Sequence, residues 1–113
     1  MLLSCTNDMF GLNKPERVEL SASTSMFDSL AEAGGLHTLT GKVHLKSGET
    51  TTGIDWYIDN ELVTVPSTYS EGIAVDSYSN GMLVYRIVKA GVYRIKAEAF
   101  ADNSKFAECV VQV

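Results

Sequence analysis

The sequence holds few of the residues from which catalytic sites are built and none of the motifs that arrange them. Among its 113 residues are two histidines, two cysteines and one tryptophan. It has no G-x-S-x-G nucleophile elbow, no glycine-rich phosphate loop, no H-E-x-x-H and no C-x-x-C. We therefore expect a protein that is not an enzyme, with no catalytic residues, no cofactor and no resident metal.

Positive charge and long apolar runs are also scarce. Nine Lys and Arg stand against fourteen Asp and Glu, which gives a formal net charge of −5. Such a charge repels phosphate backbones and anionic lipid surfaces. No stretch approaches the roughly 18 consecutive apolar residues of a membrane-spanning helix. These features argue against nucleic acid as a partner and leave protein as the expected one.

The two cysteines do not predict a disulfide framework. Cys5 lies near the N-terminus, whereas Cys109 falls on the core-facing side of the last predicted strand. One bridge between them is the alternative that the count allows. We expect Cys109 to behave as a small apolar core residue, and the redox compartment stays open.

The length and the residue pattern predict one β-sheet domain preceded by an arm. From residue 17 onward, short alternating segments are separated by Gly, Asn, Ser and Thr, which is typical of a sandwich. Residues 1–16 contain apolar side chains but no partner strand. We therefore expect an N-terminal arm at 1–16 and a domain at 17–113. Residues 25–33 fit either two helical turns or an irregular loop.

Three apolar residues follow one another at the spacing of an immunoglobulin core. Val43, Trp56 and Ile95 stand where such domains place a cysteine, a tryptophan and a second cysteine, and Tyr93 has the offset of the tyrosine corner. The sequence therefore predicts an all-β fold, an immunoglobulin-like β-sandwich of about seven antiparallel strands. The other inward residues expected from alternation are Val18, Leu20, Leu39, Gly41, Leu45, Ile54, Ile58, Leu83, Tyr85 and Ile87.

Two turns are predicted in detail. Asn80-Gly81 is typical of a hairpin turn in which both central residues have positive φ. Asp102-Asn103-Ser104 indicates a second hairpin between strands at 93–100 and 106–113. A turn centred on Asn103 places Ala99 opposite Ala107 and Phe100 opposite Phe106, with apolar inward pairs throughout. The small pairs near this turn indicate a sandwich that tapers at that end.

Alternation turns three aromatic residues outward on one sheet. Tyr57, Phe100 and Phe106 are expected on the outer side of the strands at 54–58, 93–100 and 106–113. Outward aromatics either mark a contact surface or occur singly on any protein. The two histidines, His37 and His44, are expected to be exposed surface residues and not metal ligands.

One cluster of carboxylates offers a metal alternative. Asp55, Asp59 and Glu61 would hold calcium if Glu71 or Asp76 supplied further oxygens, since Ca²⁺ takes six to eight. No loop has ligand spacing specific for calcium. The competing interpretation is a solvated strand face followed by a turn at Asp59-Asn60.

Four segments resemble bacterial immunoglobulin-like domains, which also occur in structural proteins of tailed phages. They are residues 39–45, 54–59, 91–97 and 109–113. The resemblance covers about residues 17–113 and implies a sandwich used for display, spacing or adhesion. It leads to our first hypothesis, a decoration or auxiliary protein of a phage head or tail at the virion surface. Its arm would bind capsid or tail subunits by strand addition, with Met9, Phe10 and Leu12 filling pockets.

A second resemblance lies in the arm. Leu2-Leu3-Ser4-Cys5 is similar to a bacterial lipobox, which implies lipidation of Cys5. The alternative hypothesis is therefore a lipoprotein at the outer surface of the bacterial cell envelope, with the sandwich binding a cell-surface partner and the membrane reached only through Cys5. An export signal of about 15 to 30 residues ordinarily spans this region, and only four residues precede Cys5 here.

Overall fold

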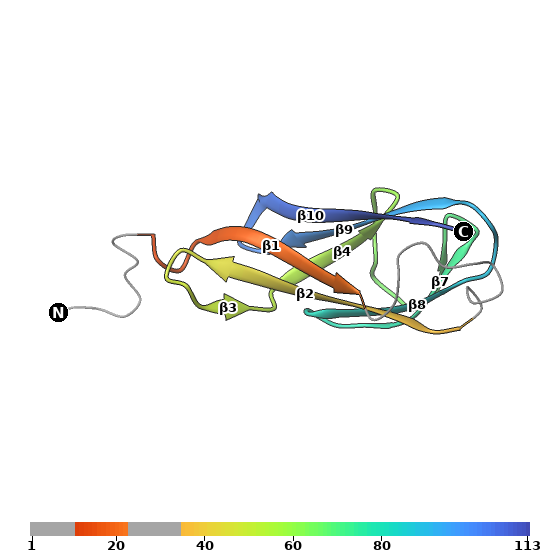
Figure 1. Ribbon diagram of the computed structural model, residues 1–113, viewed down its shortest axis with the longest axis horizontal. Coiled ribbons are helices and arrows are strands. Elements are labelled where there is room, and N and C mark those ends of the chain that lie inside the picture. The colour runs from red at the N-terminus through yellow and green to blue at the C-terminus, as the bar shows by residue number, and fades with distance from the viewer. Residues whose placement is uncertain (1–10, 23–34) are drawn as a thin grey trace.

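The computed structural model describes residues 11–22 and 35–113. These residues form two antiparallel sheets packed face to face, and the fold is an immunoglobulin-like β-sandwich (Figure 1). The segment expected as a helix or loop at 25–33 lies outside the described residues, as do Cys5, Met9 and Phe10. The described part of the chain contains no helix long and apolar enough for a membrane crossing.

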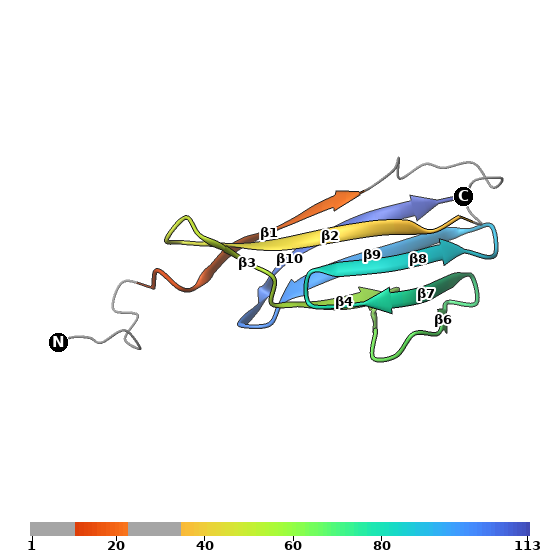
Figure 2. The same ribbon diagram turned by 90° about the horizontal axis from the view of Figure 1, so that it is seen from below.

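Ten strands make up the two sheets. The strands are β1 (Pro15–Ala22), β2 (His37–Leu45), β3 (Thr50–Thr51), β4 (Ile54–Ile58), β5 (Glu61–Leu62), β6 (Thr68–Tyr69), β7 (Ile73–Tyr78), β8 (Met82–Ile87), β9 (Val92–Ala99) and β10 (Asp102–Gln112). One sheet has the order β1-β2-β8-β7-β6, with β3 paired to β2, and the other has the order β10-β9-β4-β5. Figure 2 shows β1, β2, β8 and β7 side by side across the first sheet.

The strand count differs from the prediction of about seven. Seven strands have five or more residues, and the other three, β3, β5 and β6, have two residues each. A two-residue pairing leaves no alternating run in the sequence. The long strands were therefore visible in the pattern, whereas the short ones depend on contacts that only the folded chain makes.

The predicted core is confirmed. Val43, Trp56 and Ile95 are each at most 2% exposed. The Tyr93 hydroxyl donates to the carbonyl oxygen of Lys89 at 2.6 Å, which is the hydrogen bond of a tyrosine corner. Gly41 leaves room for this core, because a Cβ there would lie 2.5 Å from Ile54 Cδ1.

One hydrogen bond links the two sheets through the tryptophan. The indole Nε1 of Trp56, on β4, donates to the carbonyl oxygen of Ser79 at 2.8 Å. Ser79 lies in the turn between β7 and β8, and its N–H donates to the Met82 carbonyl at 2.8 Å. The only polar atom of the indole is thus satisfied inside the sandwich.

The predicted register of the last hairpin is wrong by two residues. Ala107 pairs with Ala97, and Cys109 pairs with Ile95. The turn itself is 100–101, and the next residues form an irregularity in which Asp102 Oδ1 accepts hydrogen bonds from the N–H and hydroxyl of Ser104 at 3.0 and 2.6 Å. Because the shift is even, every inward residue stays inward.

The positive φ angles lie at other turns than the one predicted. Neither Asn80 nor Gly81 has positive φ. Asp59-Asn60, between β4 and β5, has φ of 48° and 70° and so forms the type of turn expected at 80–81. The carbonyl of Gly81 accepts the N–H of Gly41 at 2.9 Å, so the 80–81 turn is held by a neighbouring strand.

The two histidines occupy different environments. His37 was expected at the surface but is buried, because β2 begins at this residue and gives it the inward parity of Leu39. Its ring centroid lies 5.6 Å from that of Tyr85. His44 lies on the outward side of β2, where its Nε2 is 2.8 Å from Glu19 Oε1.

The described part of the arm is bonded to the sandwich. Strand β1 begins at Pro15, two residues before the expected boundary. The carbonyls of Leu12 and Lys14 accept the N–H groups of Ser47 and Lys46 at 2.9 and 3.1 Å. Leu12 keeps 46% of its side chain exposed. Residues 12–16 therefore continue the edge of the first sheet.

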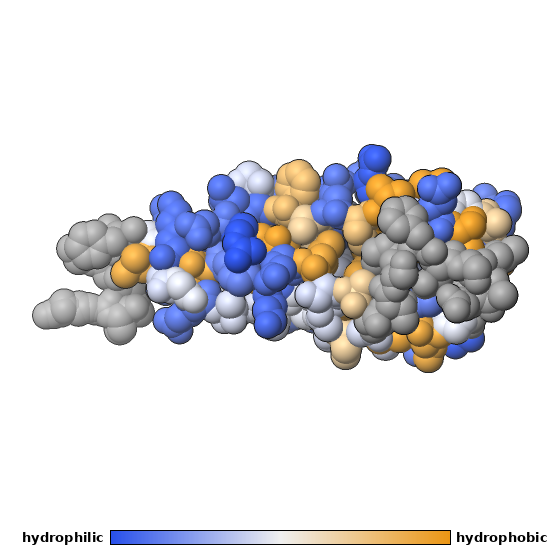
Figure 3. Space-filling model, in the orientation of Figure 1, coloured by the Kyte–Doolittle hydropathy of each residue, from blue (hydrophilic) through white to orange (hydrophobic). Residues whose placement is uncertain are grey.

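The side of the molecule on which β1 and β10 run carries a mixed surface. Figure 3 shows hydrophobic residues interspersed with hydrophilic ones on this side. The partly buried apolar residues of these two strands are Leu20, Ala107, Cys109 and Val113. They pack against the core and extend it to the sandwich edge.

Candidate interaction face

The outward side of the β10-β9-β4-β5 sheet brings two predicted aromatic residues together. Tyr57 on β4 pairs with Lys96 on β9, and Phe106 on β10 pairs with Glu98 on β9. Residues opposite one another on adjacent strands share a face. We call this side, with Tyr57, Lys96, Glu98 and Phe106 at its centre, the outer face.

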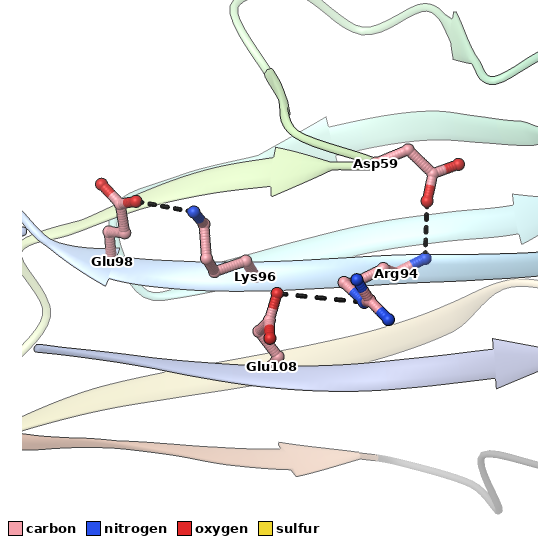
Figure 4. A network of polar contacts seen from close by, with 5 residues as sticks. All are labelled: Asp59, Arg94, Lys96, Glu98 and Glu108. Carbon is pink, nitrogen blue, oxygen red and sulfur yellow. Dashed lines mark hydrogen bonds and ion pairs between the residues drawn. The ribbon is translucent and has the colours of Figure 1, made fainter.

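Lys96 lies at the centre of the outer face, between Tyr57 and Phe106. Its Nζ lies 4.8 Å from the centroid of the Tyr57 ring and 5.5 Å from that of Phe106. The same atom is 2.9 Å from Glu98 Oε2 (Figure 4). The hydrogen bond to Glu98 raises the pKa of Lys96 against the opposing effect of burial. The ammonium thus stays charged between the two rings, in cation–π geometry.

Burial changes the titration of two further groups on the outer face. It raises the pKa of Asp55, and the carboxylate of Glu98, which pairs across from it, adds to the effect. Burial also raises the pKa of the Tyr57 hydroxyl, again followed by the charge of Glu98. Two carboxyl groups directly opposite each other repel when both are ionised, so Lys96 offsets part of that repulsion through Glu98.

Apolar side chains continue the outer face beyond Lys96. Val92 is 61% exposed, and Val110 and Leu62 are exposed as well. Val92, Val110, Arg94, Asp59 and Asn60 line a shallow hollow of about 190 Å³. Next to it, Arg94 Nε lies 4.0 Å from Glu108 Oε2, as Figure 4 shows.

Asp59 anchors the edge of the outer face. Its Oδ1 accepts the N–H of Arg94 at 2.9 Å, and its Oδ2 accepts the hydroxyl of Ser70. Both oxygens are therefore used within the protein. Among residues 11–22 and 35–113, no group of three or more His, Cys, Asp or Glu is placed to hold a metal ion. The calcium alternative at Asp55, Asp59 and Glu61 gains no support from this geometry.

Phe100 does not take its predicted position opposite Phe106. It belongs to the β9–β10 turn and does not face Phe106, which pairs with Glu98. The prediction that Phe100 and Phe106 lie opposite each other is wrong, because the turn comes earlier than expected. Phe100 instead lies beside Gly53 and donates its N–H to the Gly53 carbonyl at 2.9 Å.

Phe100 forms one wall of a groove at the end of the sandwich. The groove has a volume of about 310 Å³. Its lining residues are Asn13, Pro15, Val43, Leu45, Thr51, Gly53, Ala99, Phe100 and Ala101. Most of these side chains are apolar, so the groove offers no constellation of catalytic groups.

Sequence reasoning missed Lys96 and the exposed valines of the outer face. The signal for Lys96 was its parity with Glu98 on the same predicted strand, which places both on the outward side. Its position opposite Tyr57 needs the β4–β9 register, and that register follows only from the folded sheet. Cys109 is not a nucleophile candidate, because burial raises the pKa of its thiol to about 11.

The chain matches no protein-family model, no curated protein and no solved structure. The fold is therefore assigned from the strand order and the packing of the two sheets.

Proposed function

We propose that this protein is a non-enzymatic immunoglobulin-like display module that binds protein. We further propose that it is located at the surface of a phage virion, as a decoration or auxiliary protein of the head or tail. The observation that carries the binding role is the outer face, where Tyr57 and Phe106 flank a fixed lysine. The virion setting is supported by the resemblance of four sequence segments to immunoglobulin-like domains of tailed phages.

The outer face has the chemistry of a protein contact surface. Aromatic residues are enriched in protein interfaces, and exposed apolar side chains lose water there at little cost. Both cations of the face, Arg94 and Lys96, lie within 4.0 Å of a carboxylate. With the net charge of −5, this pairing supports a protein partner over nucleic acid.

The arm supports attachment at one end of the sandwich. The chain enters the described domain at residue 11, at the end where the β2–β3 turn and the β9–β10 turn lie (Figure 1). A partner bound to residues 1–10 would hold the sandwich by this end and leave the outer face free along its side. Met9, Phe10 and Leu12 remain the proposed arm contacts.

A lipoprotein of the bacterial cell envelope is the second candidate, because Leu2-Leu3-Ser4-Cys5 is similar to a lipobox. In that case a lipid on Cys5 would replace the protein contact of the arm. Mass spectrometry of the protein from its native source separates the two. An acylated N-terminal cysteine establishes the lipoprotein, whereas an intact Met1 excludes it.

Deletion of residues 1–10 tests attachment through the arm. The deletion ends before Leu12 and Lys14, whose carbonyls are bonded to the β2–β3 turn. We expect a folded domain by far-UV circular dichroism that no longer enters particles. A shortened protein that is incorporated as well as the full chain would reject the mechanism.

Replacement of the two aromatic residues tests the outer face. Tyr57→Ser with Phe106→Ser should weaken binding to particles that lack the protein by about thirtyfold, the effect of losing about 2 kcal/mol at an interface hot spot. Met82→Ser is the matched control, since Met82 is an exposed apolar residue of β8 in the other sheet. Equal binding by both variants would move the contact away from the outer face.

A further inference from the structure

The groove lies where the sandwich core reaches an open end. Its floor includes Val43 and Ala99, which belong to the buried core. Pro15 and Leu45 form the wall that belongs to the first sheet, and Phe100, 54% exposed, stands on the opposite wall. The groove therefore lies over the end of the core between the two sheets.

Small residues explain why this end is open. Ala97, Ala99 and Ala107 are the inward residues of β9 and β10 closest to the turn, and their methyl groups fill little of the space between the sheets. The volume of about 310 Å³ is at the lower limit of the ~300–1,000 Å³ typical of ligand pockets. Such a space suits one large side chain better than a cofactor.

We infer that the groove is a binding site for Phe10 of the same chain. Phe10 directly precedes Gly11, and both Asn13 and Pro15 line the groove. Gly11 has a φ of 69°, and its carbonyl accepts the N–H of Lys14 at 3.1 Å. This turn holds Gly11 close to Lys14, at the groove end of the sandwich.

The reach of the chain agrees with this occupant. Asn13 lies three positions after Phe10, and an extended chain over three positions spans at most about 11 Å. Lys14 is also close to the β9–β10 turn: the pKa of Asp102 is lowered mainly by its hydrogen bonds to Ser104, and the charges of Lys105 and Lys14 add to this. The start of the described chain and the aromatic wall of the groove thus lie at the same place.

Phe10 of the same chain is favoured over the arm of a second copy. A short tether gives an effective concentration in the millimolar range, which an untethered arm at micromolar protein concentration does not reach. This inference removes Phe10 from the proposed arm contacts and leaves Met9 and Leu12 to a partner. It does not depend on the proposed virion function, because residues 1–9 remain available for attachment. Phe10 would fix the direction in which those residues leave the domain.

A cysteine pair tests the inference on the isolated full chain. In a background of Cys5→Ser and Cys109→Ala, Phe10→Cys is combined with Ala101→Cys, and the protein is oxidised at micromolar concentration. We expect most molecules to form an intramolecular disulfide, seen as a monomer by non-reducing electrophoresis and located by mass spectrometry. Phe10→Cys with Asn103→Cys is the matched control, because Asn103 is exposed in the same hairpin but does not line the groove.

Each other outcome overturns the inference. Dimers from the Phe10/Ala101 pair would assign the groove to the arm of a second copy. Absence of a link, or equal linking of Asn103, would show that Phe10 does not occupy the groove. A second measurement uses unmodified cysteines: Phe10→Ala should lower the melting temperature by several degrees and Met9→Ala should not. Equal melting temperatures for the two variants would also reject the site.

Discussion

The two ends of the sandwich cover the shared hydrophobic core in different ways. At the end formed by the start of β9 and the β6–β7 turn, Tyr69 and Tyr93 donate hydrogen bonds from their hydroxyls to the carbonyls of Val65 and Lys89 at 2.8 and 2.6 Å. We call this the tyrosine end. At the opposite end, which holds the groove, Phe100 offers only an apolar ring.

The contrast shows how one fold can close one end of its core tightly and leave a groove at the other. A tyrosine covers the core and still satisfies its polar atom, so it seals an end without leaving a cavity. At the groove end the inward residues are alanines, and a groove lies over the core. The same sheets thus provide a closed end that stabilises the domain and a grooved end at which we infer that Phe10 binds.

Replacement of Trp56 tests the core that both ends share. Trp56→Ala should lower the free energy of unfolding by about 3 to 5 kcal/mol, since it removes a large buried side chain and the hydrogen bond to Ser79. Denaturant unfolding followed by circular dichroism measures this loss. A loss below about 1 kcal/mol would contradict a common core centred on Trp56.

Two glycines test the difference in packing between the two ends. A Cβ on Gly72 would lie 1.7 Å from the hydroxyl oxygen of Tyr93, whereas a Cβ on Gly53 would lie 3.5 Å from Phe100 Cδ2. Gly72→Ala should therefore cost about 3 kcal/mol through overpacking, and Gly53→Ala should change stability by about 0.5 kcal/mol or less. Thermal unfolding of the two variants provides the test. Similar losses would remove the distinction between a tight and an open end.

The smallest expected effect concerns the tyrosine hydroxyl. Tyr93→Phe should cost about 1 kcal/mol at neutral pH, the typical net value of one hydrogen bond. Burial, followed by the charge of Asp59, raises the pKa of Tyr93 in the folded protein. The neutral phenol therefore stabilises the fold below pH ~10, and this contribution is lost as the pH rises through the folded pKa.

The pH dependence separates this hydroxyl from the other titrating groups. Unfolding free energies measured between pH 9 and 11 should fall less steeply for Tyr93→Phe than for the unchanged protein. Tyr78→Phe is the control, because the Tyr78 hydroxyl also donates to a carbonyl, that of Thr64, but from an exposed ring. Parallel pH profiles for the unchanged protein and Tyr93→Phe would contradict a buried neutral phenol.

The sequence predicted which residues face inward but not how far strands slide past each other. Alternation placed Val43, Trp56 and Ile95 correctly because inward parity depends only on the side-chain period of two. The β9–β10 register depends on Asp102, whose side chain binds Ser104 and takes residues 103–105 out of regular pairing. A one-dimensional pattern does not distinguish such an irregularity from the turn itself.

The same limit applies to the outer face. Tyr57 and Phe106 were expected outward together, and the structure places both beside Lys96. Phe100 was assigned to the same surface only because the hairpin was centred too late. The small residues near the last turn predicted a taper and not a groove. The walls of the groove come from β1, β2 and the β9–β10 turn, which are distant in sequence.

The bond from the Trp56 indole to the Ser79 carbonyl gives the molecule an intrinsic reporter. The chain has one tryptophan, and its N–H spans from one layer to a turn of the other. Separation of the layers would bring water to that ring and shift its emission to longer wavelength. Fluorescence of the unlabelled protein thus follows the integrity of the sandwich while residues at either end are altered.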